Sequence, residues 1–178
     1  MKKGILLPIF SILLCSFVLF GVSAILRPAA QTNALEEHLQ IMQTILPDSQ
    51  TFTIEPYTGD DETIRSVHKG ENGFVIETVT IGYAGEITML VGVNNEGRVT
   101  GLVVRTLSET FGLGAEALND HVFLAQFLNT SGEAEVGETV DAISGATVTS
   151  KAIARSVNSA VAYVTGADID SGATSWGG

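Results

Sequence analysis

Residues 86–105, EITMLVGVNNEGRVTGLVVR, decide the fold, because two apolar segments flank a short polar one. Residues 86–93 and 99–105 are rich in β-branched and other apolar side chains, as strands are. The NNEG segment between them supplies residues that tolerate positive φ, so it predicts an antiparallel hairpin. Both strands are more apolar than strict alternation would give, which predicts that helices cover one face of the sheet.

The same kind of pattern continues on both sides of this hairpin. Upstream, three more strands are predicted at residues 51–55, 64–68 and 74–79, with turns at Gly70 and Gly73. Downstream, the pattern predicts a helix over 115–128 interrupted at Asn119-Asp120, a short strand over 140–143 and a helix over 150–164. The predicted fold class is α+β, an antiparallel sheet with packed helices.

The N-terminus carries an uncharged apolar run from residue 4 to residue 26. At 1.5 Å per residue, a helix of this length crosses a hydrocarbon core of about 30 Å. Lys2 and Lys3 precede the run and Arg27 follows it, which favours an internal N-terminus and an exported domain. The alternative is a cleaved secretory signal with a site near Ala24, and this also exports the domain.

These boundaries divide the chain into four parts. They are a membrane anchor at 1–27, a linker and stalk helix at 28–49, a folded domain at 50–166 and a flexible tail at 167–178. Leu35, Leu39, Met42 and Leu46 give the stalk its helical spacing. The expected location is the cytoplasmic (inner) membrane, with a single pass and most of the chain on the extracytoplasmic side.

Charge and cysteine usage exclude several classes of function. The net charge is −11, and without residues 1–27, which hold three of the nine basic residues and no acidic one, it becomes −14. Nucleic acid is therefore excluded as a partner, because phosphate binding needs a basic surface. Cys15 is the only cysteine, so no intrachain disulfide or thiolate-held cluster is expected. His38, His68 and His121 lack metal-ligand spacing, so no metal site is predicted.

Residues 141–150, DAISGATVTS, stand between a strand-like segment and a helix and form the candidate site. A tight loop that opens onto a helix N-terminus presents unpaired N–H groups and a positive dipole, which favour a phosphate. Gly145 and Ala146 allow close backbone approach, and Asp141 is a candidate to bind a metal or hold a loop donor. Hydroxyls that can donate to a phosphate, or accept a phosphoryl group, belong to Ser144, Thr147, Thr149 and Ser150. The alternative is that Thr149 or Ser150 simply caps the helix.

Asp141-x-x-Ser144-Gly145-Ala146-Thr147 resembles the motif at which flavin transferases attach FMN to threonine through a phosphoester. Residues 144–152, SGATVTSKA, resemble the FMN-binding domain shared by the G subunit of the Rnf complex and the C subunit of the sodium-pumping NADH:quinone reductase. The resemblance implies covalent FMN on Thr147. It implies a surrounding site of Asp141, Ser144, Gly145, Ala146 and Thr149.

Three other segments resemble the same family. Residues 82–87, GYAGEI, are similar to the glycine–tyrosine segment that leads into the central strands of the family. Residues 95–103 are similar to the family's hairpin. Residues 108–114, SETFGLG, resemble its Glu-Thr-Pro-Gly-Leu-Gly loop, with Phe111 where the family usually has proline. The flavin-ring contacts that this loop implies are Glu109, Thr110, Gly112, Leu113 and Gly114.

The motif occurs a second time near the C-terminus, as Asp168-x-x-Ser171-Gly172-Ala173-Thr174. This spacing makes Thr174 a candidate for secondary flavinylation, with Trp176 able to stack on a flavin. No predicted helix follows the second motif and only four residues remain after it. Thr147 is therefore predicted as the principal site.

The resemblance implies an electron-transfer subunit of a membrane-bound, ion-translocating oxidoreductase of the ferredoxin:NAD type, which is not a complete enzyme alone. In its short length the chain is similar to the Rnf member of the family. The implied partners are other membrane subunits of such a complex, and a flavin transferase for maturation. Two alternatives stay open: a free-standing exported FMN-binding carrier without an ion pump, and a non-redox module that shares the fold.

Overall fold

In a computed structural model of the chain, the structure describes residues 12–21, 35–83, 85–107 and 120–167. The chain divides into two compact units, Met1–Gln40 and Ile41–Gly178. Residues 12–21 form a helix, and a second helix spans residues 35–45, as the spacing of Leu35, Leu39 and Met42 predicts. Within the described ranges, no helix is long and apolar enough to span a bilayer.

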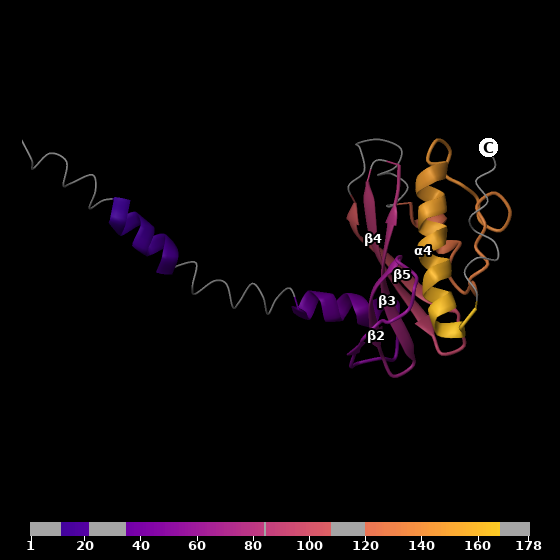
Figure 1. Ribbon diagram of the computed structural model, residues 1–178, viewed down its shortest axis with the longest axis horizontal. Helices are drawn as coiled ribbons and strands as arrows, with labels where there is room; N and C mark the ends of the chain where they lie inside the picture. Colours follow the sequence, from indigo (N-terminus) through magenta and orange to yellow (C-terminus); the bar gives the residue numbers. More distant parts are fainter. Residues whose placement is uncertain (1–11, 22–34, 84, 108–119, 168–178) are drawn as a thin grey trace, which may run out of the picture. The chain divides into compact units, whose positions relative to one another are not determined.

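The larger unit is built on a five-stranded antiparallel sheet in the order β1-β2-β3-β4-β5 (Figure 1). Each strand pairs with the next along the chain, so every connection is a hairpin or a short return. All five strands were predicted, and four of them extend by one to three residues beyond the predicted ends. The strands are β1 (Thr53–Glu55), β2 (Ile64–Lys69), β3 (Gly73–Ile81), β4 (Glu86–Asn94) and β5 (Val99–Leu107).

The predicted β4–β5 hairpin is confirmed. Gly97 has φ of 78°, and its N–H donates to the Asn94 carbonyl at 2.9 Å. The Asn94 side-chain oxygen accepts from the N–H groups of Glu96 and Arg98, so the asparagine closes the turn from within. Gly92 faces Gly101 across the pair, and the register shifts between Gly92 and Val93.

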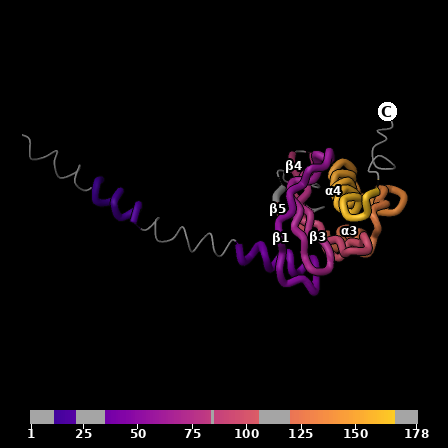
Figure 2. The backbone as a smooth tube through the Cα atoms, turned by 60° about the horizontal axis from the view of Figure 1, so that its bottom comes forward, coloured from indigo at the N-terminus to yellow at the C-terminus, as the bar shows by residue number. Residues whose placement is uncertain are grey.

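In the described residues after the sheet, the larger unit has two helices. Helix α3 (His121–Ala125) is capped by Asp120, whose carboxylate accepts from the N–H groups of Val122 and Phe123. Helix α4 (Thr147–Thr165) lies along one face of the sheet (Figures 1 and 2). Ile153, Val157 and Val161 of α4 are buried in the core, at the helical spacing seen in the sequence.

The second face of the sheet is covered as well, which corrects the expectation of a single covered face. Met42, Ile45 and Leu46 are buried, and Ile45 lies over Gly92 and Gly101. A Cβ at Gly92 would collide with the Ile45 carbonyl oxygen, so only glycine admits this backbone. This second layer explains why Leu90, which does not belong to the α4-side core, is also fully buried.

Strand β1 begins two residues after its predicted start, and three predicted elements that follow the sheet also differ in extent. Helix α4 begins at Thr147, three residues before the predicted start, because the 143–146 turn leads directly into it. The predicted strand over 140–143 is reduced to an isolated bridge between Val136 and Val140. Of the helix predicted over 115–128, the described part contains only α3, and residues 115–119 lie outside the described residues.

The direction in which α4 crosses the sheet determines which end of the sheet its N-terminus lies near. The β4–β5 turn lies at the C-terminal end of α4, since a Cβ at Gly97 would collide with the Thr165 methyl carbon. The β3–β4 turn is at the opposite end of the same antiparallel strands. The N-terminus of α4 therefore extends towards the β3–β4 end of the sheet (Figure 1).

Candidate functional site

The candidate site begins with a tight turn at residues 143–146. The Ala146 N–H donates to the Ile143 carbonyl at 2.9 Å, and Gly145, the third residue of the turn, has φ of 83°. A positive φ at this position is what a type II turn requires, and glycine adopts it without steric cost. The turn therefore explains Gly145 within the motif on conformational grounds alone.

Ser150 joins this turn to the first turn of α4. Its hydroxyl donates to the Ala146 carbonyl at 2.9 Å and accepts from the Ile143 N–H at 3.3 Å. The Ser150 N–H also donates to the Ala146 carbonyl at 2.9 Å. Ser150 is completely buried, so water does not compete for these bonds. Both backbone groups of Ile143 are thereby fixed, one by Ala146 and one by Ser150.

Thr147 is the first residue of α4, and its side chain is exposed. The N-cap is Ala146, which has no side chain able to accept from the first N–H groups of the helix. No acidic residue stands in the first turn to neutralise the positive end of the helix dipole. The Thr147 hydroxyl therefore stands in solvent at a helix end that favours a phosphate. The helix begins before Thr149 and Ser150, so neither of them caps it.

Asp141 is held from a distant part of the chain. Its N–H donates to the side-chain oxygen of Gln126 at 2.8 Å, and the Gln126 amide nitrogen donates to the Asp141 carbonyl at 3.4 Å. The Asp141 carboxylate is left exposed. Gln126, at the end of α3, thus fixes where the motif begins. The sequence alone does not single out Gln126, because this pairing depends on how α3 packs.

The predicted motif residues divide into exposed and buried ones. Asp141, Ser144, Gly145 and Thr147 are exposed, whereas Ala146 is buried and Thr149 is completely buried. The Thr149 side chain therefore points into the protein and not into solvent. The loop residues Glu109, Thr110, Gly112, Leu113 and Gly114, together with Thr174, lie outside the described residues.

Exposed apolar side chains stand on the elements at this end of the sheet. Ile81, the last residue of β3, is 73% exposed and Tyr83, in the β3–β4 turn, is 78% exposed. Val148, the neighbour of Thr147, is 39% exposed.

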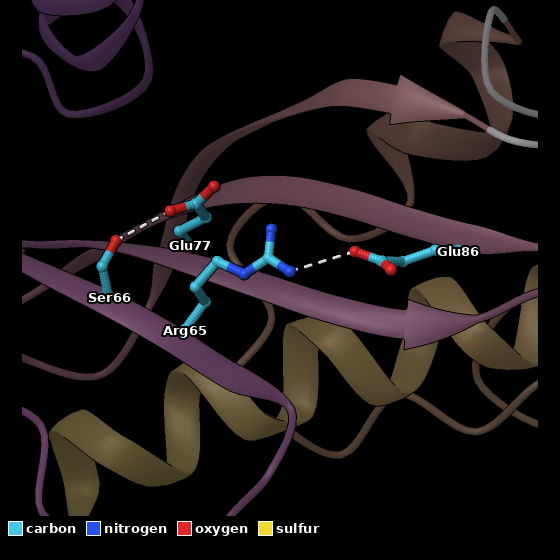
Figure 3. Close-up of polar contacts among 4 residues, drawn as sticks. All are labelled: Arg65, Ser66, Glu77 and Glu86. Carbon is cyan, nitrogen blue, oxygen red and sulfur yellow. Dashed lines mark hydrogen bonds and ion pairs between the residues drawn. The ribbon is translucent and has the colours of Figure 1, made fainter.

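The sheet face away from α4 carries polar pairs that join β2 to β3 and β4 (Figure 3). Arg65 donates to Glu86, the first residue of β4, at 3.1 Å, and both side chains are about half exposed. The Ser66 hydroxyl donates to Glu77 at 2.9 Å and lies 3.2 Å from His68 Nε2. These contacts satisfy the charges of this face locally.

A cavity of about 400 Å³ lies far from Thr147, beside the C-terminal half of α4. Residues 56–61 form one wall, and Tyr163 lies on the other, 16 positions along α4 from Thr147, or about 24 Å at the helical rise. The Tyr57 and Tyr163 rings meet edge to face. Burial, followed by the charge of Glu55, raises the pKa of the Tyr163 hydroxyl.

Comparison with known proteins identifies the family of this domain. Residues 82–162 match the FMN-binding domain family, a span that runs from the β3–β4 turn into the last part of α4 and includes Thr147. The chain is 34% identical over 145 residues to the G subunit of the ion-translocating oxidoreductase complex of Methanosarcina acetivorans, covering 72% of this chain and 76% of the relative. The chain belongs to the G-subunit family of ion-translocating oxidoreductase complexes.

Two other members of the G-subunit family show how far the similarity extends. The G subunit of the proton-translocating ferredoxin:NAD(+) oxidoreductase complex of Clostridium ljungdahlii is 28% identical over 157 residues, covering 83% of each chain. The G subunit of the Na(+)-translocating ferredoxin:NAD(+) oxidoreductase complex of Acetobacterium woodii is 37% identical over 100 residues, covering 50% of this chain and 47% of the relative. The named coupling ion therefore differs among relatives.

The residues of the motif fit a phosphate-linked flavin. A phosphate at Thr147 would meet the positive end of α4 and a glycine turn. The motif's carboxylate, on Asp141, belongs to a residue whose backbone is held by Gln126. Of the exposed apolar side chains, Val148 directly follows Thr147 in α4.

Proposed function

We propose that this chain is an electron-transfer subunit of a membrane-bound, ion-translocating oxidoreductase complex of the ferredoxin:NAD type, with FMN esterified to Thr147. The observation that carries the proposal is the exposed Thr147 hydroxyl at the uncapped N-terminus of α4. Family membership supports the complex, and the matching FMN-binding domain supports the cofactor. In this role the chain is one component of a translocase and not a complete enzyme.

The residues of the motif have separate roles in this proposal. Thr147 supplies the ester oxygen, and the first N–H groups of α4 stabilise the negative phosphate. Gly145 lets the turn approach the phosphate without a side chain in the way. Ser144 and Ala146 complete the turn, Thr149 supports it from the interior, and the exposed Asp141 faces the modifying enzyme. Glu109, Thr110, Gly112, Leu113 and Gly114 are proposed to contact the ring.

Forming the ester requires an activated flavin phosphate, because a free phosphate is a poor electrophile. Flavin adenine dinucleotide has the required anhydride. The Thr147 Oγ attacks the phosphorus bonded to the riboflavin unit, and the anhydride P–O bond breaks. Adenosine monophosphate leaves, and the hydroxyl proton passes to a base of the flavin transferase. An exposed threonine suits this step, because a second enzyme must reach it.

Bound FMN supplies one- and two-electron redox chemistry, and the protein sets its position and surroundings. The chain's own contribution is to hold the phosphate at a rigid helix end, next to the exposed side chain of Val148. Donor and acceptor are proposed to lie on other subunits of the complex. The relatives are named as subunits of such complexes, which supports partners of this kind.

We propose that residues 4–26 anchor the chain in the cytoplasmic membrane and that the FMN-binding domain lies on the extracytoplasmic side. The uncharged run and the lysines at positions 2 and 3 support this topology. The run contains no Asp, Glu, Lys, Arg or His, so the anchor is proposed not to carry ions itself. Replacing it with an unrelated span should leave ion pumping intact.

Peptide mass spectrometry tests the attachment on protein purified from a host that expresses a flavin transferase. Trypsin cleaves after Arg105 and Lys151, which isolates Thr147, and after Arg155, which isolates Thr174 on the C-terminal peptide. We expect the FMN phosphoester mass on the first peptide and its loss in Thr147→Ala, with Thr174→Ala as the matched control. Absence of the mass from both peptides would refute covalent attachment.

A second experiment separates the complex-bound subunit from a free-standing exported carrier. Affinity purification of the chain from mild detergent should recover a multi-subunit membrane complex whose electron transfer is lost in Thr147→Ala. Recovery of the flavinylated chain alone, with no other membrane protein, would favour the free-standing carrier. Thr174 is retained as a proposed secondary site, to be decided by the C-terminal peptide.

A further inference from the structure

We propose that Ser150 is a positioning residue that makes Thr147, and not the second motif, the substrate of the flavin transferase. The inference rests on the proposed function, since it concerns how Thr147 is recognised. Ser150 does not itself meet the flavin, because its side chain is completely buried. It acts through the 143–146 turn, whose shape it fixes from beneath.

The geometry shows how one hydroxyl can control the turn. Ser150 Oγ accepts from the Ile143 N–H at 3.3 Å and donates to the Ala146 carbonyl at 2.9 Å, so it joins the first and last residues of the turn. The remaining turn bond runs from the Ala146 N–H to the Ile143 carbonyl. Three hydrogen bonds therefore close a ring of protein atoms immediately before Thr147.

Loss of the Ser150 hydroxyl would leave a half-buried Ile143 N–H without its partner. An unpaired amide of this kind seeks water or another acceptor, which opens the turn in a fraction of molecules. The helix itself does not depend on that hydroxyl, because the Ser150 N–H keeps its own bond to Ala146. The expected result is a folded protein whose acceptor loop is correctly formed only part of the time.

The second motif provides a comparison within the same chain. Both motifs have the order D-x-x-S-G-A-T, but the residue three places after the threonine is Ser150 in the first and Gly177 in the second. The position of Ile143 is taken by Asp170. The second motif therefore lacks a hydroxyl at the position that closes the first turn. Local identity within seven residues is then not sufficient for modification, and the downstream serine supplies the difference.

The test measures flavin transfer to the full-length protein in detergent. The chain is produced unmodified in a host without a flavin transferase and is then incubated with purified flavin transferase and flavin adenine dinucleotide. FMN on the Thr147 peptide is followed against protein concentration, which gives KM and kcat separately. Only molecules with the formed turn are substrates in this proposal. The apparent KM is therefore inversely proportional to the fraction of molecules with the formed turn, whereas kcat does not change.

We expect Ser150→Ala to raise KM by a factor of at most about ten, because one lost hydrogen bond changes the equilibrium between formed and open turn by up to about that factor and KM follows the fraction of molecules with the formed turn. Ser150→Thr keeps a hydroxyl at the same place and should return KM towards the wild-type value. Ser156→Ala is the matched control, because Ser156 is an equally buried serine of α4 whose hydroxyl lies 3.1 Å from that of Thr80, away from the turn. Its KM should equal that of the wild type.

Three results would overturn the proposal. They are an unchanged KM in Ser150→Ala with α4 intact by circular dichroism, an equal rise in Ser156→Ala, and equal labelling of the Thr147 and Thr174 peptides in the wild type. Failure of the proposed function looks different, because the wild-type chain would then accept no flavin at Thr147 under any condition. The two failures are therefore separable in one set of reactions.

Discussion

The side-chain amide of Gln126, at the end of α3, pairs with both backbone groups of Asp141, the first residue of the D-x-x-S-G-A-T motif. The two residues are 15 positions apart, so the pairing ties the motif to a separate element of the fold. The motif is therefore positioned by α3 at its start and by Ser150 at its end. The central residues of the motif therefore lie between two positions that hydrogen bonds hold in place, Asp141 and the 143–146 turn.

Gln126→Leu should lower the free energy of unfolding by about 0.5–1.5 kcal/mol, because both exposed backbone groups of Asp141 exchange a protein partner for water while the side-chain volume is nearly kept. Urea denaturation of the chain checks the size. Gln126→Glu is the informative companion, since it keeps the acceptor for the Asp141 N–H and removes the donor to the carbonyl. A loss in Gln126→Glu as large as that in Gln126→Leu would contradict the view that the 2.8 Å bond is the stronger one.

The layer of residues 41–46 over the glycine pair gives a second prediction. Gly101→Val should destabilise the domain by about 1–3 kcal/mol or more. A Cβ at this position would stand 2.8 Å from the Ile45 Cα, so the valine side chain cannot be accommodated. Hydrogen exchange at residues 41–46 should accelerate in the same variant. Unchanged protection there would mean that Ile45 does not lie on this glycine in solution.

Thr100 offers the matched control for that experiment. Its hydroxyl donates to the Ile45 carbonyl at 2.5 Å, so Thr100→Val removes one bond to the same residue without adding bulk over the glycines. We expect a smaller loss, about 1 kcal/mol, and only modest acceleration of exchange. The difference in unfolding free energy between the two variants measures how much the packing of Ile45 on the sheet depends on the close approach of its backbone to the glycines.

The sheet could be predicted almost completely from the sequence. Residues 86–105 specify a hairpin through local signals, with Asn94 and Gly97 at positions where turn chemistry requires them. The start of α4 was less predictable, because its N-cap is Ala146, a residue that gives no capping signal. The burial of Thr149 follows from that earlier start, which turns its side chain to the core face of the helix.

The contacts that position the site could not be predicted, for a physical reason. Gln126 reaches Asp141 only once α3 has packed beside the motif, and periodicity carries no information on such a tertiary pairing. The second covered face does leave a signal in the sequence, since Gly92 and Gly101 stand opposite each other in the hairpin. Facing glycines in two neighbouring strands indicate that another backbone approaches there.

The ion pair between Arg65 and Glu86 is expected to contribute little to stability, although it is the most visible polar contact of its face (Figure 3). Both side chains are about half exposed, so water and salt screen the attraction. A double-mutant cycle with Arg65→Ala and Glu86→Ala should give a coupling free energy below about 1 kcal/mol, decreasing with added salt. A larger, salt-independent coupling would show that the pair is shielded in solution.

Alkaline titration should reveal the environment of Tyr163. Burial and the nearby Glu55 carboxylate raise the pKa of its hydroxyl, so the folded state keeps the proton to a higher pH than the unfolded chain does. Below pH 10, the ordinary value for tyrosine, the stabilisation is fully present, and it is lost as the pH rises through the folded pKa. The free energy of unfolding should therefore fall above pH 10 more steeply in the wild type than in Tyr163→Phe.

Ultraviolet titration of tyrosinate measures the same raised pKa of Tyr163 directly. The folded wild type should show a tyrosinate component that forms at higher pH than that of an exposed tyrosine, and Tyr163→Phe should remove this component. Tyr83→Phe is the control, because Tyr83 is 78% exposed and its loss should leave the highest-pH component in place. If that component instead disappears in Tyr83→Phe and persists in Tyr163→Phe, the partly buried Tyr163 hydroxyl beside Glu55 is not its source.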